Sequence, residues 1–433
     1  MTTLRTPLAE RFPAMLSWDF RRLFVNGFFT TGSRWTQVLA RGWLVHELSG
    51  GSTAAVGWVT FASFIPFVLV GPFAGAVADR FDRRRLLIYA TVFGIMGAVF
   101  LAVITIADMV QVWHVGVLAF TTGSAQAASV PTRQALIANV VPPEHLVNAI
   151  ALGGISQHGS RVIGPLFGAA FLKSFGTGSV FVFSAVLLAI GLIEVVRLRH
   201  RSGPLATVHG PRFGATARRL IGDLDEAGRY VRADRRLLTV IVLVGAHCSM
   251  TMAFDSMMPA LAELVGGSET LYSSILIGLG TGAICGTLTV SQLRVDRTKG
   301  MIFAFVGLGS GVAMVVLGTA TTPAVVVIGA MLAGLTQASY MTMSAAWVQS
   351  IVTDDYRGRV MSLYIMIAAG HMALLNLGFG RVAEFIDVRL LLVGPGLVWM
   401  AFFVFATAGM VEARSLVFRG RFAQAEPVPA AAH

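Results

Sequence analysis

Arg34, Arg161 and Asp255 are ionisable residues that stand deep inside long apolar stretches of this sequence, where charge is otherwise rare. A charged side chain in such surroundings is costly and is usually retained for a function. A carboxyl group can take up and release a proton, and an arginine nearby can act as its charge partner. We therefore expect Asp255 to be a protonation site, with Arg34 or Arg161 as its partner. The alternative is a static buried ion pair that fixes the packing between the two halves of the chain.

The elements that carry these residues are helices long enough to cross a membrane. Hydrophobic residues make up 55% of the 433 residues and charged residues 13%, whereas about 25% charged residues is usual in a soluble domain. Apolar runs of about 20 residues recur along the chain, and each can span a bilayer of about 30 Å. The sequence therefore predicts an all-α integral membrane protein with twelve transmembrane helices. The expected spans are residues 20–45, 54–77, 86–106, 112–134, 146–172, 178–196, 238–263, 271–291, 301–319, 323–352, 359–383 and 388–411.

The distribution of Lys and Arg predicts which side of the membrane each loop faces. Alternate loops, around Ser49, Asp108, Gly266 and Thr321, contain neither residue. The other loops are arginine-rich, and Arg133, at the end of the fourth expected span, is counted among their charges. Because cytoplasmic loops carry the excess of positive charge, we expect a multi-pass protein of the cell membrane with a cytosolic N-terminal tail at 1–19 and a cytosolic C-terminal tail at 412–433.

A formal net charge of +11 raises the possibility of nucleic-acid binding. The basic residues are not interleaved with aromatic ones in any recognisable nucleic-acid-binding module. Their concentration in alternate loops is explained by topology, with anionic lipid headgroups as their contact. We therefore expect a lipid bilayer around the protein and no nucleic-acid partner. We also expect the protein to be a monomer.

The chain divides into two similar halves. Residues 20–196 and 238–411 each hold six expected spans, and the basic segment 197–237 between them reads as a cytosolic linker. Within it, Leu220, Leu224, Ala227 and Val231 share one face of an amphipathic helix, which would lie at the membrane surface or form a solvated connector. A shift of 211 residues aligns Gln126 with Gln337, which favours duplication of a six-helix unit, as in transporters whose halves rock about a central site.

A charged loop follows the second expected span. Its pattern resembles the signature loop of the major facilitator superfamily and consists of Gly75, Asp79, Arg80, Arg83 and Arg84. The resemblance implies that this loop latches the two halves together in one conformation and releases them in another. Asp82 departs from the pattern, because many members have glycine there. The alternative is an ordinary cytosolic basic loop, which would account for the arginines but not for Asp79.

Further segments narrow the resemblance to the branch that contains siderophore exporters and macrolide efflux proteins. They include "GSRWTQVLARGWLVHELSG" and "DDYRGRVMSLY", the second of which places Arg357 and Arg359 in the loop before the eleventh span. In "RVIGPLFGAAF", Gly164, Pro165 and Gly168 resemble the antiporter motif of drug and proton exchangers. The motif departs from the family pattern at Ser160 and Ala169, where glycine is expected.

The resemblance also predicts where substrate binds. In the superfamily, helices 1, 4, 7 and 10 line the central cavity, so Arg34 and Asp255 would face it from opposite halves. Methionine adapts to irregular apolar shapes, and methionine and aromatic residues recur in the seventh and tenth spans. We expect the cavity to hold an amphipathic molecule, in contact with Met252, Phe254, Met257, Gln337, Tyr340 and Met341.

The combined prediction is a secondary active transporter that exports a hydrophobic or amphipathic small molecule, drug-like or siderophore-like, in exchange for protons by alternating access. The sequence contains no phosphate-binding GxxxxGK loop, no catalytic constellation and no spacing of His or Cys that favours a metal site. We therefore expect neither an enzyme nor a bound cofactor. Two alternatives stay open: an uptake symporter with the same fold, and a membrane receptor that transports nothing.

Overall fold

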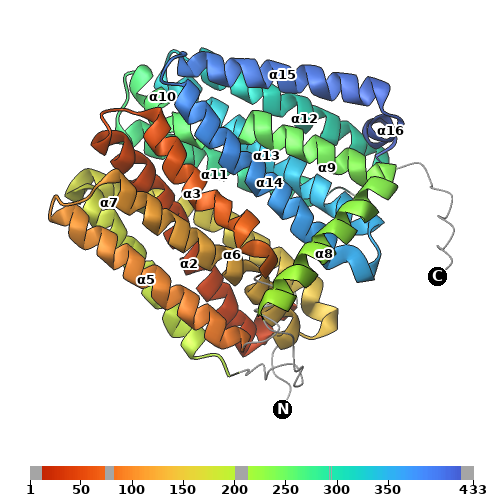
Figure 1. The fold of residues 1–433 in the computed structure, drawn as a ribbon, viewed down its shortest axis with the longest axis horizontal. Coiled ribbons are helices and arrows are strands. Elements are labelled where there is room, and N and C mark those ends of the chain that lie inside the picture. Colours follow the sequence, from red (N-terminus) through yellow and green to blue (C-terminus); the bar gives the residue numbers. More distant parts are fainter. Residues whose placement is uncertain (1–11, 74–81, 200–212, 292, 294, 421–433) are drawn as a thin grey trace.

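The computed structural model describes residues 12–73, 82–199, 213–291, 293 and 295–420. The regular secondary structure of these residues is helical throughout. Figure 1 shows the two halves side by side, the N-terminal half in red to yellow and the C-terminal half in green to blue. The sequence-based expectation of an all-α protein is confirmed for these residues.

The N-terminal half consists of a short 3₁₀ turn and five long helices. They are η1 (Pro13–Leu16), α2 (Trp18–Leu48), α3 (Thr53–Leu69), α5 (Arg83–Ile106), α6 (Val112–Val140) and α7 (Leu146–Val196), with the short turn η2 (Pro143–His145) before α7. The backbone of α7 reverses at Gly176, whose φ of 75° and ψ of 176° are not helical. Glycine adopts this conformation without a steric penalty. The two parts of α7 therefore correspond to the two spans expected at 146–172 and 178–196.

The C-terminal half begins with a helix in the linker. The helices are α8 (Phe213–Ala233), α9 (Arg235–His247), α10 (Met258–Leu264), α11 (Glu269–Ser291), α12 (Asp296–Thr319), α13 (Pro323–Ile351), α14 (Asp354–Val382), α15 (Val388–Gly409) and α16 (Val411–Arg419). Helices α6 and α13 occupy equivalent places in the two halves, and their bounds differ by the 211 residues of the expected repeat.

Nine helices among the described residues are long and apolar enough to cross a membrane, and the 49-residue run of α7 is one of them. Helices α2 and α6 are long but are not among the nine. Both carry polar residues along the bundle interior, including Arg41 and Thr132. The expected count of twelve spans therefore remains a prediction.

The seventh expected span, 238–263, is not one continuous helix. Helix α9 ends at His247 and is followed by a π turn (η3, Cys248–Met252) and a 3₁₀ turn (η4, Asp255–Met257) before α10 begins at Met258. Ala253, with φ −91° and ψ 47°, lies between the two turns. The prediction of an unbroken helix was wrong here, because hydropathy records the apolar run and not the backbone interruption within it.

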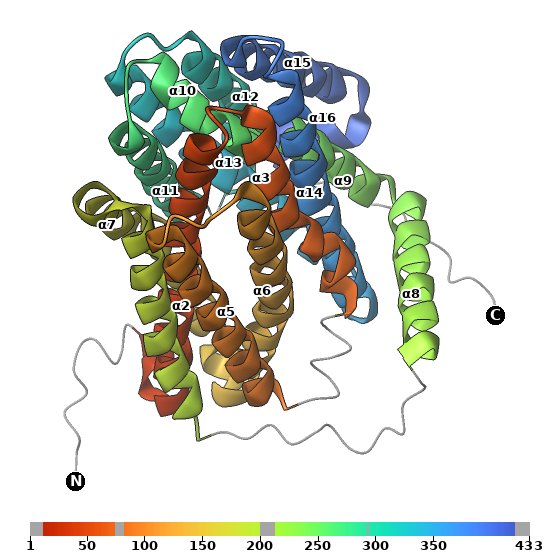
Figure 2. The same cartoon turned by 60° about the vertical axis from the view of Figure 1, so that its left-hand side comes forward.

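Helix α8 packs its apolar face against the C-terminal half, beside α9 and α14 (Figure 2). Ala227 and Val231 are buried in the core of that half. Glu226 accepts hydrogen bonds from the Tyr356 hydroxyl at 2.8 Å and from Arg359 Nη1 at 2.7 Å. The linker is therefore fastened to the first turns of α14. Arg357 and Arg359 lie within α14, which begins earlier than the expected residue 359, and not in a loop.

The two halves are in direct contact at one end of the bundle, which we call the closed end and which contains residues 46–53, 263–268 and 380–387. The Thr53 hydroxyl donates to the Gly380 carbonyl at 2.8 Å, and the Ser52 hydroxyl donates to Glu384 Oε1 at 2.6 Å. His46 Nε2 lies 3.0 Å from Glu263 Oε2. A Cβ on Gly380 would stand 2.6 Å from the Thr53 carbonyl oxygen, so α3 and α14 touch through their backbones.

We expect Gly380→Val to separate the halves at the closed end, because the new side chain has no space against Thr53. The measurement is the rate at which a thiol reagent labels Thr53→Cys, at a position that is 5% exposed, in a Cys285→Ser background. Labelling should become several-fold faster. Gly378→Val is the matched control, since a Cβ at Gly378 meets nothing within 4 Å. Equal labelling in the two variants would contradict the proposed contact.

Candidate functional site: a cationic cavity between the two halves

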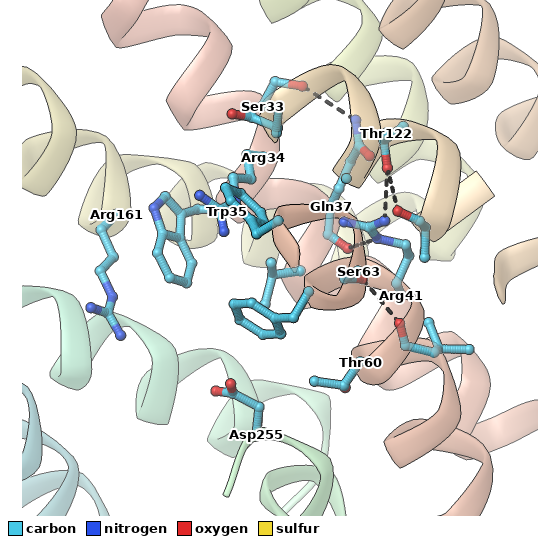
Figure 3. Close-up of a pocket in the computed structure, with 18 of the residues that line it drawn as sticks. Ser33, Arg34, Trp35, Gln37, Arg41, Thr60, Ser63, Thr122, Arg161 and Asp255 are labelled. Carbon is cyan, nitrogen blue, oxygen red and sulfur yellow. Dashed lines mark hydrogen bonds between the residues drawn. The ribbon is translucent and has the colours of Figure 1, made fainter. Parts of the chain in front are cut away.

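A cavity of ≈ 250 Å³ lies between the two halves (Figure 3). Helices α2, α3, α5, α6 and α7 form most of its wall. The C-terminal half contributes the segment around Asp255 together with residues of α11, α13 and α14. Gln126 of α6 and Gln337 of α13, which the sequence repeat aligns, both line it. The cavity thus lies where a two-fold repeat would place a central site.

The three ionisable residues singled out in the sequence all line this cavity. Figure 3 shows Arg34, Arg161 and Asp255 on separate elements around one space. The Arg161 guanidinium lies 4.4 Å from the centre of the Trp35 ring, and Arg34 lies 5.7 Å from the same ring. Within the described part of the chain, no ion pair within 4.0 Å joins Asp255 to either arginine. Asp255 and the two arginines therefore share one cavity without a direct ion pair between them.

The interruption between α9 and α10 positions Asp255. A broken helix frees backbone groups that must find other partners in a membrane. Gln337 Nε2 donates to the Thr251 carbonyl at 2.5 Å, and the Ser256 N–H donates to Asn376 Oδ1 at 2.9 Å. Asn376 is fully buried. Side chains of α13 and α14 thus hold the turn that carries Asp255. Asn376 was not predicted as a site residue, because its partner is a backbone group that becomes free only once the helix breaks.

Two further arginines line the cavity and were not recognised as site residues. Arg41 is buried, and it donates from Nη1 to the Thr122 hydroxyl at 3.1 Å and from Nε to the Gln37 carbonyl at 3.2 Å. Arg133 donates from Nη2 to the Thr30 hydroxyl at 2.8 Å. The spacing of Arg34 and Arg41, two helical turns apart on one face, was the available signal.

The assignment of Arg133 to a cytosolic loop was wrong. Helix α6 continues to Val140 instead of ending at residue 134, so Arg133 lies seven residues before the end of the helix, and its side chain lines the cavity. The prediction failed because a basic residue near the end of an apolar run reads as a loop charge under the positive-inside rule. The hydroxyl of Thr30 gives its guanidinium a polar partner inside the bundle.

Gly164 and Gly168 of the antiporter-like motif allow α7 to approach α2 closely. A Cβ on Gly164 would stand 2.5 Å from the Gly32 carbonyl oxygen, and the Gly164 carbonyl accepts a hydrogen bond from the Thr36 hydroxyl at 3.1 Å. Pro165 lies inside α7 at the next position. This contact brings Arg161 to the ring of Trp35 on α2.

Of the expected substrate-binding residues, Met252, Phe254 and Gln337 line the cavity. Met257 is buried in the core that the two halves share, since two residues along a 3₁₀ turn it points away from Asp255. Tyr340 packs inside the C-terminal half, with its ring 4.1 Å from His247 and 4.7 Å from Phe303. Met341 contacts Cys248 and Tyr364. The structure therefore brings three of the six together at the cavity.

Part of the expected latch can be placed. Gly75, Asp79 and Arg80 lie outside the described residues. Arg83 begins α5, and Arg84 donates hydrogen bonds to the carbonyls of Val195, at 3.2 Å, and Val196, at the end of α7. Asp82, the departure from the family pattern, accepts hydrogen bonds from the N–H groups of Arg84 and Arg85 and so caps α5.

An all-helical membrane bundle whose two repeated halves enclose a polar cavity defines a membrane transporter of the major facilitator type. The model of the transmembrane secretion effector family of this superfamily matches residues 12–421, and the chain belongs to that family.

The chain is similar to known transporters along most of its length. It is 21% identical to macrolide efflux protein A of Streptococcus pyogenes over 72% of this chain and 76% of the relative. It is 21% identical to the staphyloferrin A transporter of Staphylococcus aureus over 79% of this chain and 84% of the relative. Among solved structures, a POT family transporter in complex with 5-aminolevulinic acid superposes with a TM-score of 0.71 at 12% identity, covering 90% and 96% of the two chains. The expected resemblance to the superfamily is confirmed.

We expect Gly164→Val to destabilise the N-terminal half, because the added side chain meets the Gly32 backbone. Overpacking of this kind costs about 1–3 kcal/mol, so thermal unfolding in detergent should shift to lower temperature. Gly154→Val on the same helix is the control, since a Cβ there meets nothing within 4 Å. An unchanged unfolding temperature for Gly164→Val would show that α2 and α7 do not need this close approach.

Proposed function

We propose that this transporter exports an amphipathic small molecule in exchange for protons, with Asp255 as the protonation site. The observation that carries the proposal is the position of Asp255. Among the residues that line the cavity it is the one carboxylate described, it belongs to the C-terminal half, and Arg34 and Arg161 face it from the N-terminal half. A carboxylate inside a transporter bundle is a typical proton-relay group.

Protonation of Asp255 changes the attraction between the two halves. When ionised, its carboxylate attracts the guanidinium groups of Arg34 and Arg161 across the cavity, and the low dielectric of the bundle strengthens that attraction relative to water. When the carboxyl group is protonated, most of this attraction to the guanidinium groups is lost. A proton that enters from one side of the membrane therefore shifts the balance between the two conformations of an alternating-access cycle.

Two observations support export as the direction of transport. One relative is named as a macrolide efflux protein, and Gly164, Pro165 and Gly168 resemble the antiporter motif. We infer that both termini are cytosolic and that the loop with Gly75, Asp79 and Arg80 latches the halves. The apolar part of the substrate would contact Met252 and Phe254, which line the cavity with Trp35 and Phe67.

The proposal predicts that cells expressing the protein accumulate less of an exported compound from a panel of amphipathic dyes and siderophore-like molecules. A protonophore should remove this difference, and Asp255→Asn should remove it as well, because an amide cannot exchange a proton. Asp225→Asn is the matched control, since Asp225 lies on α8 and pairs with Arg229 outside the cavity. If export persists in Asp255→Asn but is lost with the protonophore, the protonation site is a different residue. If the expressing cells accumulate more of a compound than control cells, the protein is an uptake transporter.

A further inference from the structure

The described lining of the cavity carries four arginines and one acidic residue. Arg34, Arg41, Arg133 and Arg161 are the cations, and Asp255 is the acid. Asp255 lies across the cavity from Arg34 and Arg161 (Figure 3). Arg41 and Arg133 thus remain without a carboxylate opposite them among the described residues. A cavity with this excess of positive charge repels cationic molecules and attracts anions.

Arg41 and Arg133 are held in place by neutral groups. Thr122 and the Gln37 backbone fix the Arg41 guanidinium, and Thr30 fixes that of Arg133. No ion pair within 4.0 Å involves either residue in the part of the chain that the structure describes. The Nε atoms of Arg133 and Arg161 are buried and have no hydrogen-bond partner. Buried guanidinium groups without counter-charge are costly, so the arrangement is suited to a ligand that brings the counter-charge.

The arginines form a row along the contact of α2 with α6. Arg41 of α2 reaches Thr122 of α6, while Arg133 of α6 reaches back to Thr30 of α2. The two contacts are separated by 11 residues on each helix, about 16 Å at 1.5 Å per residue. Arg34 lies between them on α2 and is close enough to act electrostatically on Arg41. Arg41 is the end of the row near the closed end, and Arg133 is the end toward the opposite end of the bundle.

Apolar and aromatic side chains face this row across the cavity. Phe64 and Phe67 of α3 and Phe254 of the broken segment line the same space. The combination binds a molecule with an apolar body and at least one carboxylate, because the planar guanidinium can donate two parallel hydrogen bonds to a carboxylate.

We propose that the substrate of this transporter is an amphipathic carboxylate whose acid group binds Arg41, with Arg133 as a second contact for an anionic group nearer the opposite end of the bundle. The proposal rests on the proposed transport function and adds the charge of the substrate to it. Asp255 with Arg34 and Arg161 is the coupling group, whereas Arg41 and Arg133 select the substrate.

The test measures equilibrium binding to purified protein in phosphatidylcholine nanodiscs, without any ion gradient. The probes are dansyl-aminoundecanoic acid, its methyl ester and dansyl-undecylamine, which share one apolar body and differ in charge. Energy transfer from tryptophan to dansyl reports binding, because Trp35 lines the cavity, and empty nanodiscs give the background. The acid should bind at least about tenfold more tightly than the ester, which corresponds to about 1.4 kcal/mol.

Arg41→Gln and Arg133→Gln should each reduce this preference for the acid, and the double variant should remove it. Binding of the ester should persist in the variants, which shows that they are folded. Arg229→Gln removes the same charge from the exposed face of α8 and should leave the preference unchanged. The proposal is overturned if the amine or the ester binds as tightly as the acid, if the arginine variants keep the preference, or if no probe binds.

The outcome is separable from that of the export experiment. Preference for the acid in a protein that shows no proton-dependent export would keep the anionic site and overturn the exchange mechanism. Proton-dependent export of dyes without preference for the acid would keep the exchange mechanism and overturn the anionic site.

Discussion

The constraint on which this structure depends is the burial of arginine guanidinium groups inside a membrane bundle. Charge within the hydrocarbon region is tolerated where it faces a cavity and has polar partners. Arg41 and Arg133 meet this requirement through threonine hydroxyls on the neighbouring helix, and Arg161 through the face of Trp35. The partners come from α2 and α6 or from α2 and α7. The packing of these helices therefore also supplies the polar partners of the charged groups in the cavity.

The same packing depends on the close approach of helices at glycine residues. Gly164 lets α7 lie against the backbone of α2, and Gly380 lets α14 lie against α3. The first contact belongs to the N-terminal half and sets the distance between Arg161 and Trp35. The second joins the two halves at the closed end. Small residues that permit such contacts are the usual means of helix association in membranes, where burial of apolar surface gives little advantage.

Hydropathy and charge distribution predicted the membrane fold, and three isolated charges predicted the cavity, because both signals are carried by single residue types along one helix. Arg34, Arg161 and Asp255 were found for this reason. Arg133 was misplaced, because the end of a helix inside a bundle is set by packing and not by the first basic residue. The break before Asp255 was also missed. Its stability depends on Gln337 and Asn376, which lie far away in the sequence and have partners only in the folded chain.

Asn376 joins the charged site to the closed end. Its side chain accepts the Ser256 N–H beside Asp255, while its backbone carbonyl lies against Gly57, where a Cβ would stand 2.6 Å away. Gly57 and Gly380 face each other one helical turn further along α14. Opening of this end must move α14 relative to α3, and the same displacement pulls on the turn that holds Asp255. In the proposed mechanism, Asn376 is the one residue through which a change in the charge of Asp255 would reach the contact that keeps the halves together.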